Sequence, residues 1–235
     1  MQSITLESPT ALPSEFISRL KEHRDLFQEN RFLEAVLENR AVRTIADDLN
    51  VYLSKLRIHG YHCTKEPAQG FFESNGLRPT DVRTHQLEFL ELFGEQFTAN
   101  EIAEMKVAWE AYFEVDGQRR LRDGLVWVCL SRSLVKSSGT ETLFRYFGGE
   151  SIFKPLLQKN SIATKLEEIG QPVIVEVSLP GDSVNARYEM AITVLSHHHA
   201  KIRDDAYPYQ SEACLRQAVP PEDIVKVTPL RDFPF

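Results

Sequence analysis

The first strand-like segment of this sequence is IHGYHC, residues 58–63. Its mixture of aromatic and small residues is typical of a buried strand. Apolar side chains recur at helical spacing before it, from about Pro13 to Leu56, and predict two or three amphipathic helices. After it, Pro67 opens a segment that ends at Asn75-Gly76, which predicts a turn and a short helix with a glycine cap. The chain therefore places several helices before its sheet begins.

The rest of the chain predicts more helices and then more strands. Helical spacing returns from Asp81 to about Val115, where Thr98 and Glu101 have the form of a capping box. The runs LVWVCL (residues 125–130) and PVIVEVSL (residues 172–179) are apolar and of strand length, and the first is expected to be a central strand. Two further short strands are expected at residues 214–219 and 224–227, which makes the C-terminal half rich in strands.

This order differs from the regular strand–helix alternation of a doubly wound sheet. We therefore predict an α+β fold. An N-terminal helical extension would cover residues 1–56. The domain itself would cover residues 57–235 and contain the stretch after Asp81 as a helical insertion.

Composition and charge narrow the class of protein. The 235 residues are 42% hydrophobic and 26% charged, which is an ordinary globular composition. The net charge of −7 argues against a protein that holds nucleic acid by charge alone, although it is compatible with a locally basic cleft. Cys63, Cys129 and Cys214 are far apart and indicate neither a disulfide framework nor a zinc knuckle. With no leader-like or membrane-spanning apolar run, we expect a soluble cytoplasmic protein without a membrane partner.

The commonest signatures for nucleotides, metals and hydrolysis do not occur. The sequence lacks GxGxxG after a strand, GxxxxGK[ST], HExxH and GxSxG. The run His197-His198-His199 has metal-binding side chains, but adjacent residues point in different directions and rarely chelate one ion. We predict a solvated or partly buried run there and no metal site.

One resemblance involves HGYHCTK (residues 59–65) and FFESNGLRP (residues 71–79), which together we call the first block. It resembles the first motif of ADP-ribosyltransferase-like domains, in which a strand ends in His-x-Thr and a short helix closes on Gly-Leu. The resemblance implies a split β-sheet core of that family and NAD as the co-substrate.

The same resemblance implies roles for residues of the first block. His62 would bond a ribose hydroxyl, Cys63 and Thr64 would line the NAD cleft, and Gly76 with Leu77 would end the helix that supports the nicotinamide. A strand displays residues 62 and 64 on the same face, as such a pair requires.

The pyrophosphate and the nicotinamide need further groups. Arg78, Arg83 or Lys65 is close enough in sequence to supply a cation to the pyrophosphate. Tyr146 or Phe72 is the predicted aromatic ring that stacks on the nicotinamide.

Two later blocks bear the carboxylates. YFGGE (residues 146–150), the second block, looks like a segment found midway through several bacterial members of the superfamily. QSEACL (residues 210–215) and VPPEDI (residues 219–224), the third block, are similar to the end of ADP-ribosyltransferase toxins that modify DNA. That likeness implies that Glu212 is the catalytic carboxylate, with Glu150 as the alternative. A carboxylate suits the reaction because cleavage of the nicotinamide–ribose bond builds positive charge on the ribose.

Each of these residues also has a purely structural interpretation. Glu212 would then be a solvated charge on an edge strand, and Glu150 a carboxylate in the first turn of a helix. His62 would be a partly buried histidine and Tyr146 a core aromatic. The run Arg119-Arg120-Leu121-Arg122 is interpreted either as a solvated charge run or as a patch that faces nucleic acid.

The resemblance covers residues 58–79 and 207–228 well, the middle loosely and the N-terminal helices not at all. It implies an NAD-dependent mono-ADP-ribosyltransferase of the toxin or effector kind, found in toxin–antitoxin or phage-defence systems, with a nucleic-acid base or a protein side chain as acceptor. The N-terminal helices would offer a docking surface for an antitoxin or a chaperone. The alternatives are a non-catalytic interaction module and an NAD glycohydrolase. A relative of RNA 2′-phosphotransferases is disfavoured by the small number of basic residues.

Overall fold

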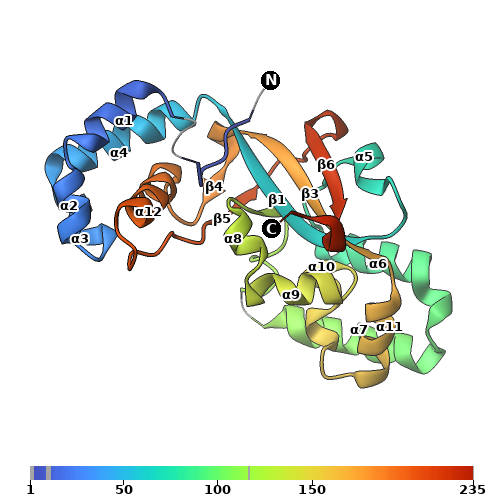
Figure 1. Ribbon diagram of the computed structural model, residues 1–235. Coiled ribbons are helices and arrows are strands. Elements are labelled where there is room, and N and C mark those ends of the chain that lie inside the picture. The colour runs from blue at the N-terminus through green and yellow to red at the C-terminus, as the bar shows by residue number, and fades with distance from the viewer. Residues whose placement is uncertain (1–2, 9–11, 116, 235) are drawn as a thin grey trace. The chain divides into compact units, whose positions relative to one another are not determined.

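The computed structural model of the chain describes residues 3–8, 12–115 and 117–234 (Figure 1). Helices and strands are mixed, and the strands form one six-stranded antiparallel sheet in the order β4-β5-β2-β1-β3-β6. This confirms the predicted α+β class. The strands are β1 (Arg57–Glu66), β2 (Val126–Cys129), β3 (Gln171–Pro180), β4 (Asn185–Ala186), β5 (Glu212–Leu215) and β6 (Ile224–Pro229).

The chain divides into two compact units, each built from three segments. Unit 1 comprises Met1–Tyr61, Val128–Leu134 and Val177–Cys214. Unit 2 comprises His62–Trp127, Val135–Glu176 and Leu215–Phe235. Strand β1 passes from the first unit to the second after Tyr61, so the compact units do not follow the predicted boundary at residue 57.

Unit 1 contains the N-terminal helices and one helix from the C-terminal half. Helix α12 packs against α2, α3 and α4 (Figure 1). The helical spacing before the first strand predicted two or three helices, and the structure has four there, because short turns interrupt the pattern. The α-helices of this unit are α1 (Ser14–Lys21), α2 (Arg24–Glu29), α3 (Leu33–Leu37), α4 (Arg40–Leu53) and α12 (Met190–Ile202), and the first three residues of α8 (Arg132–Val135) also belong to it.

Unit 2 is built around an aromatic core that includes Phe89, Trp109 and Phe147. The Trp109 indole N–H donates to the Ile152 carbonyl over 2.9 Å, which ties α7 to the α10 turn. The predicted capping box at Thr98 is confirmed. The α-helices of this unit are α5 (Phe71–Asn75), α6 (Val82–Phe93), α7 (Ala99–Glu114), α9 (Ser138–Arg145), α10 (Gly149–Ile152) and α11 (Asn160–Glu168), and the last residue of α8 (Arg132–Val135) also belongs to it.

The C-terminal half contains the predicted strands together with helices that were not predicted. Strands were expected at residues 172–179, 214–219 and 224–227, and β3, β5 and β6 occupy or overlap these positions. The prediction missed α11 and α12, although buried Ile162, Ala163 and Leu166 of α11 have helical spacing. Helix α12 is apolar over most of its length and was hidden because it is buried on several sides. None of the described helices is long and apolar enough to cross a membrane.

Candidate functional site

The end of β1 in unit 2 presents two predicted site residues on one face of the strand. His62 and Thr64 are half-buried, whereas Cys63 and Lys65 between and after them are buried. The side chain of Cys63 therefore points away from the face that His62 and Thr64 share. The prediction that the Cys63 side chain lines an NAD cleft with them is wrong, because successive residues of a strand face opposite sides.

His62 has a defined protonation state. Its Nδ1 lies 2.8 Å from the carbonyl oxygen of Trp127, which only accepts hydrogen bonds, so Nδ1 carries a proton. Burial lowers the pKa of His62 below 6.5, and the bond to Trp127 opposes this effect. The ring is therefore neutral near pH 7 and its Nε2 has a free lone pair. This nitrogen is suited to accept a hydrogen bond from a hydroxyl group.

The short helix α5 ends at a glycine that no other residue can replace without strain. Gly76 has a φ of 67°, and a Cβ atom there would lie 2.1 Å from the carbonyl oxygen of Val219. The next residue, Leu77, is buried and exchanges two backbone hydrogen bonds of 2.8 Å with Val219. The first block is thus paired directly with the VPPEDI turn of the third block. Gly76 and Leu77 make this pairing through their backbones.

Among the predicted pyrophosphate cations, Lys65 is already engaged. Its ammonium is buried and lies 2.5 Å from the Glu167 carbonyl, with those of Arg145 and Leu166 at 3.4 and 3.5 Å. Desolvation lowers the pKa of Lys65. The Lys65 side chain caps the C-terminal ends of α9 and α11, so its prediction as a pyrophosphate ligand is wrong.

The two arginines of this region are at the surface. Arg78 forms an ion pair of 2.9 Å with Glu88, and its side chain is 66% exposed. Arg83 is exposed on the first turn of α6. Phe72, predicted as one of the stacking rings, is buried and meets the His62 ring edge-on with centroids 6.4 Å apart. It supports the His62 ring from one side.

The second block has a structural role. Tyr146 is buried in the aromatic core, where its ring lies 5.6 Å from that of Phe153. Glu150 forms ion pairs with Arg122 at 2.6 Å and with Lys154 at 2.5 Å. A ring inside the core offers no face to a ligand, so the predicted stacking role of Tyr146 is wrong. The paired carboxylate of Glu150 agrees with its structural interpretation.

Glu212 lies in unit 1, where it opens β5. Its side chain is 46% exposed, and Nη1 of Arg187 lies 3.6 Å from its Oε1. The backbone N–H of Arg187 also donates to the Glu212 carbonyl over 2.9 Å. Arg187 was missed from the sequence because β4 and β5 are 25 residues apart in the chain, and only their pairing, with Asn185 opposite Cys214, places the two side chains together.

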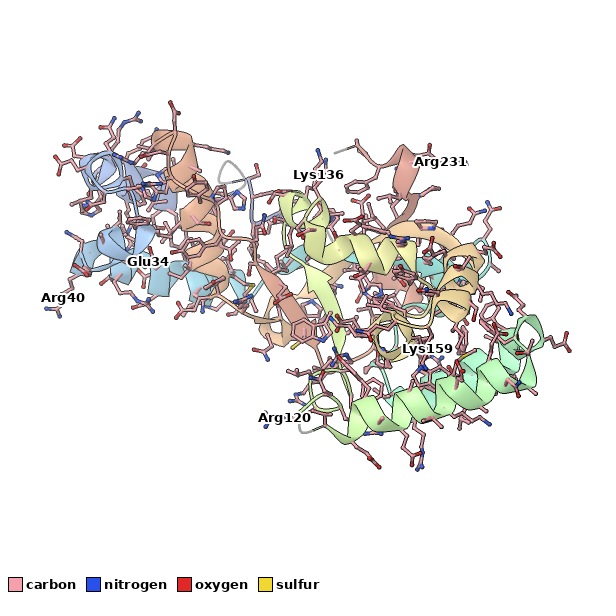
Figure 2. All side chains as sticks on the ribbon, turned by 90° about the horizontal axis from the view of Figure 1, so that it is seen from below. Glu34, Arg40, Arg120, Lys136, Lys159 and Arg231 are labelled. Atoms are coloured by element: carbon pink, nitrogen blue, oxygen red, sulfur yellow. The ribbon has the colours of Figure 1, made fainter. Side chains whose placement is uncertain are left out.

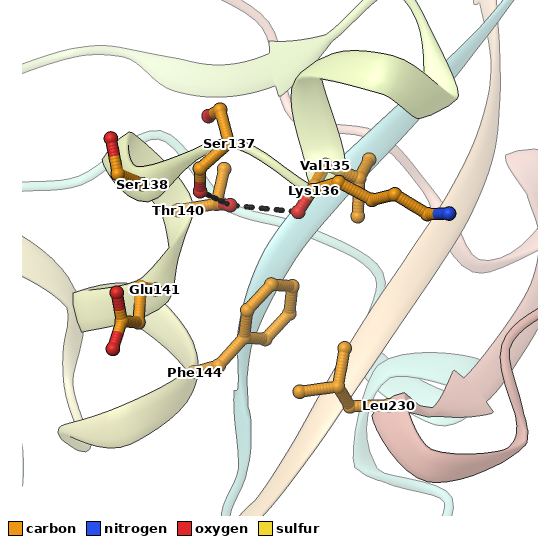
Figure 3. A pocket seen from close by; sticks show the side chains of 8 residues that line it. All are labelled: Val135, Lys136, Ser137, Ser138, Thr140, Glu141, Phe144 and Leu230. Atoms are coloured by element: carbon orange, nitrogen blue, oxygen red, sulfur yellow. Dashed lines mark hydrogen bonds between the residues drawn. The ribbon is translucent and has the colours of Figure 1, made fainter. Parts of the chain in front are cut away.

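The pocket shown in Figure 3 lies elsewhere in unit 2. It is lined by residues of the α8–α9 junction and by Leu230, and has a volume of about 410 Å³. The hydroxyl of Thr140 donates hydrogen bonds to the carbonyls of Val135 and Ser137. None of the predicted site residues lines this pocket. Its lining combines hydroxyl, charged and apolar side chains, a mixture that favours no particular class of ligand.

The comparisons with known proteins give no family. No protein-family model, no curated protein and no solved structure matches this chain. Within the part of the chain that the structure describes, no three His, Cys, Asp or Glu side chains are grouped so as to hold a metal ion. His197, predicted to be solvated or partly buried, is 9% exposed on α12.

Proposed function

We propose that this chain is an NAD-dependent mono-ADP-ribosyltransferase on an ADP-ribosyltransferase-like fold. The observation that carries the proposal is the reciprocal pairing of Leu77 with Val219. This pairing unites two blocks that lie about 140 residues apart in the sequence and were each linked to this family only by resemblance. A chance resemblance of two short segments would not require them to be neighbours. The same unit presents His62 and Thr64 on one face of β1, close in sequence to the paired segment.

The chemistry of the site residues suits the transfer of ADP-ribose. In the proposed reaction the bond between nicotinamide and the ribose breaks, and its electron pair leaves with the nicotinamide. A nucleophilic atom of the acceptor bonds to the anomeric carbon, and its proton passes to a carboxylate, the role that the resemblance implies for Glu212. The same carboxylate stabilises the positive charge that develops on the ribose.

The remaining groups bind and orient NAD. His62 accepts a hydrogen bond from a ribose hydroxyl through Nε2, because its other nitrogen is held by the Trp127 carbonyl. Orientation of this kind lowers the barrier by fixing the reacting atoms in place. Arg78, a residue of the first block whose side chain is 66% exposed, is the cation proposed for the pyrophosphate. The toxin or effector role and the cytoplasmic location belong to the same proposal.

The test is the release of nicotinamide from NAD by purified protein, with and without DNA, RNA and cell lysate. The wild type, His62→Ala and Glu212→Gln are compared with two matched controls. His85→Ala removes another half-buried histidine of unit 2, whose Nε2 lies 3.0 Å from the Gly148 carbonyl and whose pKa is also lowered by burial. Glu22→Gln neutralises an exposed carboxylate of unit 1.

Loss of the carboxylate should reduce release by about 100- to 10,000-fold, the range of general-base catalysis. The controls should remain near the wild-type rate once their folding is verified by circular dichroism. Mass spectrometry of the added DNA, RNA and proteins identifies the acceptor. Release into water alone would indicate an NAD glycohydrolase. Folded wild-type protein that releases no nicotinamide under any condition would support a non-catalytic interaction module.

A further inference from the structure

An exposed tryptophan of unit 2 lies on β2, the strand whose backbone contacts His62. Trp127 is 40% exposed, although its neighbours Val126 and Val128 on β2 are buried. Its indole N–H donates to the Leu121 carbonyl over 3.2 Å, which fixes the ring against the loop that follows α7. Its own carbonyl is the group that holds His62. The ring is therefore exposed and already held in one orientation. Because it is ordered before a ligand binds, binding costs little side-chain entropy.

Three exposed arginines belong to the same region. Arg119 and Arg120 lie on the loop that carries Leu121, and Arg120 is labelled there in Figure 2. Arg83 is exposed on α6. The pKa of Asp81 is lowered first by its hydrogen bonds with Thr84, and then by the charges of both Arg119 and Arg83. The two arginines are thus close enough to act on one carboxylate.

The acidic groups of this region pair only weakly with the arginines. Asp81 caps α6 by accepting from the Thr84 N–H over 2.6 Å. Asp123 accepts from the Val82 N–H over 2.8 Å and lies 4.0 Å from Arg119. An ion pair this long between exposed groups contributes little. Arg120 forms no ion pair with any of the residues that the structure describes.

We propose that Trp127, Arg83, Arg119 and Arg120 form a binding surface for single-stranded nucleic acid. An exposed indole stacks on an unpaired base, and the arginines of the same region contact phosphates. A duplex offers no free base to the ring, so the surface favours a single strand over a duplex. Because the net charge of the chain is −7, binding depends on this local cluster and not on the whole protein.

Where this inference names the acceptor class, it rests on the proposed function. In that case a base or ribose of the bound strand is the acceptor of ADP-ribose. Binding itself needs no NAD. The surface can therefore be tested independently of catalysis.

The experiment measures the fluorescence anisotropy of a labelled mixed-sequence single-stranded DNA or RNA oligonucleotide with the full chain, without NAD and over a range of salt concentrations. We expect Trp127→Ala to weaken binding by about 5- to 150-fold, the contribution of one stacked base. Trp127→Phe keeps a ring and should retain most of the affinity. The double variant Arg119→Ala/Arg120→Ala should reduce the salt slope by about 0.7 for each phosphate that the protein no longer neutralises. Arg231→Ala removes an arginine that is 84% exposed on another side of unit 2 and should have no effect (Figure 2).

The outcomes separate the surface from the reaction. Binding that depends on Trp127 and the arginines, without nicotinamide release, would uphold the surface and overturn the proposed function. Nicotinamide release without any oligonucleotide binding would overturn the surface and point to a protein acceptor or to water. Binding that is unchanged in folded Trp127→Ala and Arg119→Ala/Arg120→Ala would also overturn it, as would equal affinity for the duplex.

Discussion

Replacing Gly76 with alanine should destabilise the protein far more than replacing Gly70, another glycine of unit 2 with a positive φ. The backbone of Gly76 has a φ of 67° and a ψ of −158°, a region that residues other than glycine rarely adopt. Forcing alanine into it costs about 1–3 kcal/mol. The added Cβ would also lie 2.1 Å from the Val219 carbonyl oxygen, so the segments must separate. The two backbone hydrogen bonds between Leu77 and Val219 would then weaken, at about 0.5–1.5 kcal/mol each.

Together these effects lower the free energy of unfolding by roughly 2–6 kcal/mol. A decrease of about 3 kcal/mol lowers the Tm of a chain of this length by roughly 6–12 °C. The assay is thermal unfolding followed by circular dichroism, with urea unfolding to obtain the free energy. The matched control is Gly70→Ala, because Gly70 has a φ of 80° but a Cβ there meets nothing within 4 Å. Equal destabilisation of the two variants would show that the clash with Val219 contributes nothing, and would refute this reasoning.

Three further predictions concern titration and charge. Burial lowers the pKa of His197 and of His198 from 6.5 to about 4. Between pH 4 and 6.5 the unfolded chain therefore binds more protons than the folded chain. The free energy of unfolding should consequently fall as the pH falls from about 6.5 to 4. Urea unfolding at several pH values should show a flatter profile when both are replaced by glutamine. Lys65→Met should cost about 1–3 kcal/mol in urea unfolding because it leaves buried carbonyls without their donor. Glu150→Gln should lower the Tm, since Arg122 loses its counter-ion, and should leave nicotinamide release by the folded protein unchanged.

Each of these predictions has a control. Lys106→Met changes an exposed lysine of α7 and should leave stability nearly unchanged. Lys154→Ala keeps the pair between Glu150 and Arg122 and should cost less than Glu150→Gln. His23→Gln should retain the pH profile of the wild type. A profile unaffected by replacement of both His197 and His198, or loss of nicotinamide release in folded Glu150→Gln, would contradict the corresponding prediction.

Local patterns in the sequence were sufficient for much of the fold. The strand at residues 58–63, the glycine cap at Gly76 and the capping box at Thr98 all depend on residues close together in the chain, and all three were found. Helix α12 was missed because a helix buried on several sides lacks the polar face that makes its period visible. Strand β4 has only two residues, too few for any pattern.

The candidate site was harder to predict because burial decides which side chains are exposed. Lys65 and Arg83 are equally basic in the sequence, yet one is enclosed by carbonyl groups and the other faces solvent. Arg122 and Arg120 belong to one run of charges, and only Arg122 is buried against Glu150. These differences arise from packing between segments far apart in the chain. A sequence pattern of basic residues therefore cannot distinguish a ligand-binding cation from a structural one.

The pairing of Leu77 with Val219 also explains why the two turns carry their particular residues. After Val219, Pro220 is extended, with φ −70° and ψ 162°, and Pro221 then opens the short 3-10 helix before β6. A proline has no N–H, so the hydrogen bonds that join the segments must come from Val219 itself. Gly76 must then approach this backbone without a side chain. The glycine and the two prolines together allow the close approach of the two segments, and they hold the end of α5, the helix whose Phe72 ring lies edge-on to the ring of His62.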